Sequence, residues 1–177
     1  MPSAGGQKEK ELNRYTNNIY SIPIMANSYH QLFIHIVFSV KYRQCLIHKI
    51  EQELYRYIIG VIESEKNKCK LIAIGGAPDH VHILVSMHPM ISVADLVKEI
   101  KTASSLWINS QDIYMGKFHW QDGYSAFSLG MSQQDAAVQY ILNQKEHHKR
   151  VSFHDELVAL LQKYNIKFDE RFIGGAE

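Results

Sequence analysis

Two short segments carry side chains whose types and spacing could support chemistry. In the first, Asp79 to Val85, two histidines stand two residues apart, at His80 and His82. Residues two apart on a β-strand point to the same face, so the two imidazoles would stand side by side as nitrogen ligands. In the second, the spacing of four between Tyr140 and Gln144 would bring a phenol and an amide oxygen onto one face of a helix.

Each segment is also typical of ordinary structure. With 10 histidines in 177 residues, an H-x-H pair is expected by chance in roughly every second chain of this composition. The alternative interpretation of His80 and His82 is a pair of partly exposed strand histidines. A tyrosine on an amphipathic helix, such as Tyr140, usually belongs to the core or its rim. The chemistry therefore depends on the elements that position these residues.

Length and composition indicate one globular domain. The chain has 177 residues, of which 46% are hydrophobic and 21% charged, as in an ordinary globular protein. Residues 1–26 are polar, without clear periodicity or the apolar core of a signal peptide, so we expect an extension before a single domain over 27–177. Cys45 and Cys69 form no C-x-x-C pair, and no apolar run is long enough to cross a bilayer. A cytoplasmic protein without a membrane partner is expected.

The charge does not indicate a dedicated binder of duplex nucleic acid. Such proteins usually carry a basic excess, whereas the net charge here is +1. Contacts to nucleic acid would have to come from local clusters, such as Lys41 to Arg43, Lys98 with Lys101, and Lys145 to Arg150. The alternative for each cluster is a solvated helix end or loop.

The hydrophobic periodicity predicts four strands and four helices. Strands are expected over 29–40, 69–74 and 80–87, with a fourth, bent strand over 118–121 and 125–129. Helices are expected over 48–66, after Ser92, over 133–148 and after Ser152. Gly75-Gly76 should close the second strand, and Asp79 should bond its own backbone in the turn that follows.

The resulting order is β-α-β-β-α-β-α-α. It fits an α+β fold, a ferredoxin-like antiparallel sheet with helices packed on one face, plus C-terminal helices that carry Tyr140. His80 and His82 would then begin a strand at the end of the sheet, where side chains can meet a ligand.

Several sequence blocks, taken in order, resemble a known family. They are Phe38 to Arg43, Asp79 to His82, Ser92 to Lys98, Ser104 to Asn109, Trp120 to Ser128, Tyr140 to Gln144, and His147-His148. Together they resemble the single-tyrosine HUH transposases of small bacterial insertion sequences, the IS200-like kind, over about Ser28 to Phe172. A match of many ordered blocks is far more specific than one H-x-H pair.

The resemblance implies a function and a site. The protein would be a DNA transposase that cleaves and rejoins single-stranded DNA beside imperfect hairpins at the ends of an insertion sequence. His80, His82 and Gln144 would hold a divalent metal ion, and Tyr140 would be the catalytic nucleophile. The resemblance also implies a homodimer, in which the tyrosine helix of one subunit can complete the site of the other.

These groups suit such chemistry. A phenol has a pKa near 10 and needs activation at neutral pH. An ion held by two neutral imidazoles and an amide keeps its full charge and can stabilise a departing 3′ oxygen, and this ligand set suits Mg²⁺ or Mn²⁺ better than a structural zinc. Attack by Tyr140 would give a 5′-phosphotyrosine and a free 3′-hydroxyl. Because one ester replaces another, rejoining needs no ATP.

Contacts to the DNA backbone are expected from basic residues near the motifs, namely Lys41, Arg43, Lys98 and Lys101. Either exposed aromatic residues or Trp120 are expected to stack on splayed bases, and Trp107, on an apolar stripe, is expected to lie in the core.

Two other functions stay open. One is a DNA-hairpin-binding protein that does not cut, and the other is a metal-dependent phosphodiesterase without a covalent step. The second would need a general base near the metal, and Asp79 is the only carboxylate close to His80 in the sequence.

Overall fold

The fold is a four-stranded antiparallel sheet between two layers of helices. The computed structural model describes residues 29–173, apart from the side chain of Phe172, and the chain divides into units 1–31 and 32–177. The expected extension over 1–26 lies outside the described residues. Within 32–173 the sheet order is β2-β3-β1-β4. The strands are β1 (Phe33–Ser39), β2 (Lys70–Ala77), β3 (His80–Ser86) and β4 (Ser125–Leu129).

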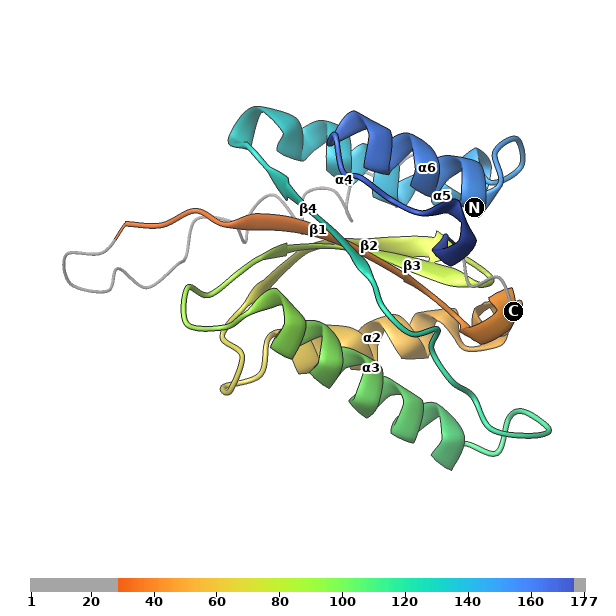
Figure 1. Ribbon diagram of the computed structural model, residues 1–177. Coiled ribbons are helices and arrows are strands. Elements are labelled where there is room, and N and C mark those ends of the chain that lie inside the picture. Colours follow the sequence, from red (N-terminus) through yellow and green to blue (C-terminus); the bar gives the residue numbers. More distant parts are fainter. Residues whose placement is uncertain (1–28, 174–177) are drawn as a thin grey trace, which may run out of the picture. The chain divides into compact units, whose positions relative to one another are not determined.

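The helices divide between the two faces of the sheet. Figure 1 shows α2 and α3 on one face and α4, α5 and α6 on the other. Their bounds are α2 (Glu51–Ile62), α3 (Val93–Ser110), α4 (Gln134–Leu142), α5 (Gln144–His147) and α6 (Phe153–Lys163), with short 3₁₀ segments at Lys41–Arg43, Ile47–Lys49, Met131–Gln133 and Glu170–Phe172. This confirms the predicted α+β sheet, with the C-terminal helices as a second layer. No helix within the described residues is long and apolar enough to span a membrane.

The register between β1 and β3 places the two histidines under the C-terminal helices. His82 pairs with Val37 and His80 with Ser39, and residues directly opposite in a sheet share a face. Val37 belongs to an apolar cluster with residues of α6, including Phe153 and Leu157. The face of β3 that carries both histidines is therefore the one covered by α4, α5 and α6.

The opposite face holds the second core, under α2 and α3. Its fully buried side chains include Leu54, Ile58, Ile62, Leu96, Ile100 and Ile108. Trp120 is only 6% exposed, and its Nε1 donates a hydrogen bond of 2.9 Å to Ser104 on α3. The expectation that Trp120 stacks on splayed bases is therefore wrong, which leaves exposed aromatic residues as the predicted stacking groups. Trp107, expected in the core, is half-buried and stacks on Tyr57.

Two predicted boundaries differ from the structure. The bent fourth strand is confined to β4, because residues 118–121 contribute one isolated bridge, between Trp120 and Val40. The long helix expected over 133–148 is interrupted at Asn143, which has φ −97° and ψ 11°.

The second strand was expected to end at Gly75-Gly76. In the structure it runs through both glycines to Ala77. The reason is the packing of α4 on the sheet. Gly75 pairs with His82, and a Cβ atom at Gly75 would lie 2.2 Å from the carbonyl oxygen of Ile141. A glycine here lets the residue next to Tyr140 approach the sheet beside His82.

Replacing Gly75 by alanine is expected to destabilise the fold by about 1–3 kcal/mol, the cost of inserting a methyl group into a packed contact. It should also move the backbone next to Tyr140. Gly60→Ala is the control, because a Cβ at this helical position meets nothing within 4 Å, and it should add about 0.5–1 kcal/mol of stability. Denaturant unfolding measures both, and equal midpoints for G75A and the unaltered protein would contradict the packing argument.

Candidate active site

His80 and His82 form a fully buried pair. Both are 0% exposed, and their ring centroids lie 5.1 Å apart. The Nε2 atoms of both rings are buried without a hydrogen-bond partner among the residues that the structure describes. Buried polar atoms are nearly always satisfied, so two adjacent unsatisfied nitrogens indicate a site for a ligand. The burial excludes the alternative of partly exposed strand histidines.

Asp79 orients the first histidine. Nδ1 of His80 lies 2.7 Å from Oδ1 of Asp79, so the ring donates its Nδ1 proton to the carboxylate and leaves a lone pair on Nε2. Asp79 also accepts hydrogen bonds from Nη2 and, at 3.1 Å, Nε of Arg43. Asp79 was expected to bond its own backbone, but its carboxylate binds these two side chains instead. Burial lowers the pKa of His80 to about 4, so the ring is neutral at pH 7.

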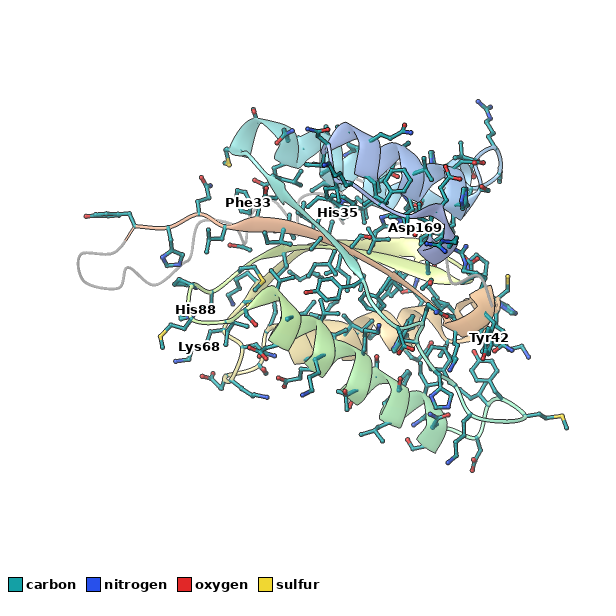
Figure 2. The ribbon with its side chains drawn as sticks, viewed as in Figure 1. Phe33, His35, Tyr42, Lys68, His88 and Asp169 are labelled. Atoms are coloured by element: carbon teal, nitrogen blue, oxygen red, sulfur yellow. The ribbon has the colours of Figure 1, made fainter. Side chains whose placement is uncertain are left out.

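His35 on β1 orients the second histidine. Nε2 of His35 lies 2.9 Å from Nδ1 of His82, and Figure 2 shows His35 between the sheet and the C-terminal helices. Burial and the neighbouring His82 lower the pKa of His35 to about 3, so the His35 ring is neutral. When His35 accepts the Nδ1 proton of His82, the lone pair of His82 is on Nε2. In this tautomer, both histidines of the pair present Nε2.

Glu156 on α6 is the residue that the sequence analysis missed. Its side chain is 2% exposed, and Oε2 lies 3.3 Å from Nε2 of His82 and 3.7 Å from Nε2 of His80. His148 donates through Nε2 to the same oxygen at 3.1 Å. Burial opposes ionisation, but the hydrogen bond from His148 and the contact with His82 hold the pKa of Glu156 well below its usual range. The cluster therefore contains a buried carboxylate.

The same carboxylate reaches the tyrosine. The Tyr140 hydroxyl donates a hydrogen bond to Oε1 of Glu156, and Nε2 of Gln144 donates to Oε1 at 2.8 Å. The ring centroid of Tyr140 lies 5.8 Å from that of His82. Burial, followed by the contact with Glu156, raises the pKa of Tyr140 above its usual value. Tyr140 and Gln144, predicted to lie close together, thus contact the same carboxylate oxygen.

The residues present fit a divalent metal ion. One nitrogen or oxygen atom from each of His80, His82, His148 and Glu156 can be chosen so that all lie within 4.8 Å of one another. Two ligand bonds of about 2.1 Å span about 4.2 Å, so small shifts would bring such atoms around one ion. The Oε1 atom of Gln144 is also buried and has no hydrogen-bond partner within the described part of the chain.

His148 differs from the other members of this group. Its Nδ1 lies 2.9 Å from the Val151 carbonyl oxygen, and its Nε2 contacts Glu156, so both nitrogens act as donors. Although burial opposes it, the contact with Glu156 raises the pKa of His148. The lone pairs available to an ion are therefore those of His80, His82, Gln144 and Glu156.

A sequence signal for Glu156 existed. Within α6 the buried residues are Phe153, Glu156, Leu157 and Leu161. Glu156 thus occupies the centre of the apolar stripe of an amphipathic helix, where a carboxylate is rarely buried without a partner. A glutamate on such a stripe, in a chain with a histidine pair, indicates a buried polar site.

The four basic residues proposed to contact DNA lie in different settings. Lys98 is exposed on α3, under the face of the sheet opposite to the histidine pair (Figure 1). Lys41 is half-buried, with Nζ 5.3 Å from the ring centroid of Tyr42. Arg43 binds Asp79, and Nζ of Lys101 donates to the carbonyl oxygens of Gln121, at 2.5 Å, and Gly123, at 2.8 Å.

A protein family and a known transposase match this chain in sequence. A family described as "Transposase IS200 like" matches residues 28–144. The ISDra2 transposase TnpA of Deinococcus radiodurans is 26% identical over 123 residues, which make up 66% of this chain and 86% of that protein. The region matched by the family, residues 28–144, contains His80, His82, Tyr140 and Gln144 but ends before Glu156.

Solved structures share the fold. A protein of Deinococcus radiodurans R1 assigned as a transposase superposes with a TM-score of 0.55 and 23% identity, over 70% of this chain and 98% of that one. A REP-associated tyrosine transposase bound to a REP hairpin gives a TM-score of 0.54 and 16% identity, over 88% of this chain and 98% of that one.

Proposed function

We propose that this chain, which belongs to the family of IS200-like transposases, cleaves and rejoins single-stranded DNA through a covalent bond between Tyr140 and a 5′ phosphate. One observation carries the proposal. The Tyr140 hydroxyl and the unsatisfied Nε2 atoms of His80 and His82 meet at one buried carboxylate, that of Glu156. The proposed nucleophile and the proposed metal ligands therefore lie close together within a single chain.

The proposed step exchanges one phosphodiester for another. The phenolic oxygen of Tyr140 attacks phosphorus, the bond from phosphorus to the 3′ oxygen breaks, and the 3′ oxygen leaves to become a hydroxyl. Glu156 accepts the hydrogen bond of the phenol and so holds the hydroxyl in place, and the phenolic proton passes in the end to the departing 3′ oxygen, so that no proton is gained or lost. The reverse step, with a different 3′-hydroxyl, rejoins the strand without water or ATP.

His80, His82, Gln144 and Glu156 would hold the divalent ion, and the Mg²⁺ or Mn²⁺ expected there would polarise the phosphate and stabilise the departing 3′ oxygen. Asp79 and His35 keep the two imidazoles in the tautomer that presents Nε2. Oxygen ligands from an amide and a carboxylate beside imidazoles are consistent with the expected preference for these ions.

We propose single-stranded DNA with hairpins at the ends of an insertion sequence as the substrate, and the cytoplasm as the location. A solved relative bound to a REP hairpin supports this class of DNA. Lys41, Arg43, Lys98 and Lys101 stay the proposed phosphate contacts. Arg43 and Lys101 would have to exchange their present partners for phosphate.

The proposed function is tested with labelled single-stranded oligonucleotides copied from the DNA that flanks the gene. Incubation with Mn²⁺ or Mg²⁺ should give a labelled protein band that survives denaturation, and EDTA should prevent it. Binding without cutting would support the hairpin-binding alternative instead. Cutting without a covalent band would support the phosphodiesterase alternative.

The homodimer is also a proposal, and the structure bears on how its sites are built. Because Tyr140 and the histidine pair contact Glu156 of the same chain, we expect each site to be complete within one subunit. A mixture of His82→Ala and Tyr140→Phe proteins should then form no more covalent adduct than either variant alone. Recovery of adduct in the mixture would show that the tyrosine helix exchanges between subunits.

A further inference from the structure

A groove of about 650 Å³ opens beside the nucleophile, in the layer formed by α4 and α6. Its walls include Ala136 and Ala137 of α4 and Ala159 of α6, and it also contacts Tyr140 and Tyr164. Ala136 and Ala159 are exposed, whereas His35 and Glu156, which also line the groove, are 3% exposed. The groove therefore runs from the surface down to the cluster that contains Tyr140.

The walls are suited to a flat aromatic ligand. The ring of Tyr164 is held against Phe127, with ring centroids 4.8 Å apart, so one aromatic face is fixed before a ligand arrives. Nucleobases stack on such side chains. Ser132 and Gln133 add groups that can bond the edge of a base, and Lys163 adds a cation next to any phosphate. The volume lies within the range of pockets that hold small molecules.

We propose that this groove binds the base of the nucleotide that becomes attached to Tyr140, on the 3′ side of the scissile phosphate. The inference rests on the proposed function, which places that phosphate at the Tyr140 hydroxyl. Because the attached nucleotide is one bond from this phosphate, its base must lie close to Tyr140. Tyr140 lines this groove and a second hollow that extends to Arg150, and the groove has the more apolar walls, which suit a base. A held base would keep the phosphotyrosine aligned for the second 3′-hydroxyl.

Ala159→Leu tests the groove, since leucine is a good helix former at an exposed position and fills the space beside α4. Ala94→Leu is the matched control, because Ala94 is exposed on α3, on the other face of the sheet. The first measurement is binding of the four deoxynucleoside 5′-monophosphates and of deoxyribose 5-phosphate, by titration calorimetry with Mn²⁺ present. This arm needs no cleavage.

A base should raise affinity about 10-fold over deoxyribose 5-phosphate, the strength of one stacked base. A159L should remove this difference and A94L should keep it. If deoxyribose 5-phosphate binds as tightly as the nucleotides, or if A159L keeps the difference, the groove does not bind a base. Either result is independent of whether the protein cuts DNA.

The second measurement uses the adduct assay with an abasic site placed immediately 3′ of the cleaved phosphate. The abasic substrate should slow adduct formation about 10-fold in the unaltered protein and have no further effect in A159L. The assignment would be overturned if the abasic substrate slowed A159L by the same factor as it slows the unaltered protein. It would also be overturned if the unaltered protein reacted with the abasic substrate at the full rate. If adduct forms but the abasic substrate behaves in either of these ways, the groove assignment fails and the proposed function stands. If no substrate gives an adduct, the result counts against the proposed function and not against the groove.

Discussion

Tyr140→Phe is expected to abolish the covalent protein–DNA adduct, with cleavage falling about 10³-fold or more. The substitution removes the only atom that would attack phosphorus. It keeps the ring, which packs 5.8 Å from the ring centroid of His82 and 6.2 Å from that of His35, so the fold should be unchanged. Binding of Mn²⁺ and of single-stranded DNA should stay near the level of the unaltered protein. Denaturing gels measure the adduct, and fluorescence anisotropy measures DNA binding.

Tyr124→Phe is the control for loss of a phenol elsewhere, because Tyr124 is exposed and lies outside the histidine cluster. It should form adduct at the normal rate. If Y140F still forms an adduct, another residue is the nucleophile. A further outcome is that Y140F cuts at the normal rate while neither Y140F nor the unaltered protein forms an adduct. In that case the reaction is hydrolysis, and the phosphodiesterase alternative would replace the transposase.

Glu156→Gln is expected to weaken Mn²⁺ binding about 10–100-fold, the usual consequence of losing a group that ligates or orients at a metal site. Cleavage should fall by at least as much, because the carboxylate also accepts the Tyr140 hydrogen bond. Glutamine keeps the size of the side chain and one oxygen but removes the negative charge that faces His82 and His148. Titration calorimetry measures Mn²⁺ affinity, and the adduct assay measures cleavage.

Glu53→Gln is the matched control, since Glu53 is an exposed carboxylate on α2, on the face of the sheet away from the site. It should change neither measurement. An E156Q protein with normal Mn²⁺ affinity but slow cleavage would restrict Glu156 to a role at Tyr140. Normal values for both would remove Glu156 from the proposed site altogether.

The sequence determined the features that depend on local geometry. The two-residue spacing of His80 and His82 set them on one face of a strand, because this period follows from strand geometry alone. The four-residue spacing also predicted that Tyr140 lies near Gln144, although the helix is interrupted between them at Asn143. The order of strands and helices, and the α+β class, also followed from periodicity. The ordered motifs that resembled the transposases were confirmed by the family match over residues 28–144.

Only the tertiary structure decided what surrounds these residues. Glu156 is 74 residues from His82 in the sequence, and the two meet because α6 packs on the face of the sheet that β3 presents. The burial of Trp120, the use of Asp79 to orient His80, and the extension of β2 through Gly75 likewise depend on partners far along the chain. Spacing reports which side chains share an element, whereas burial and ligand geometry arise where separate elements pack together.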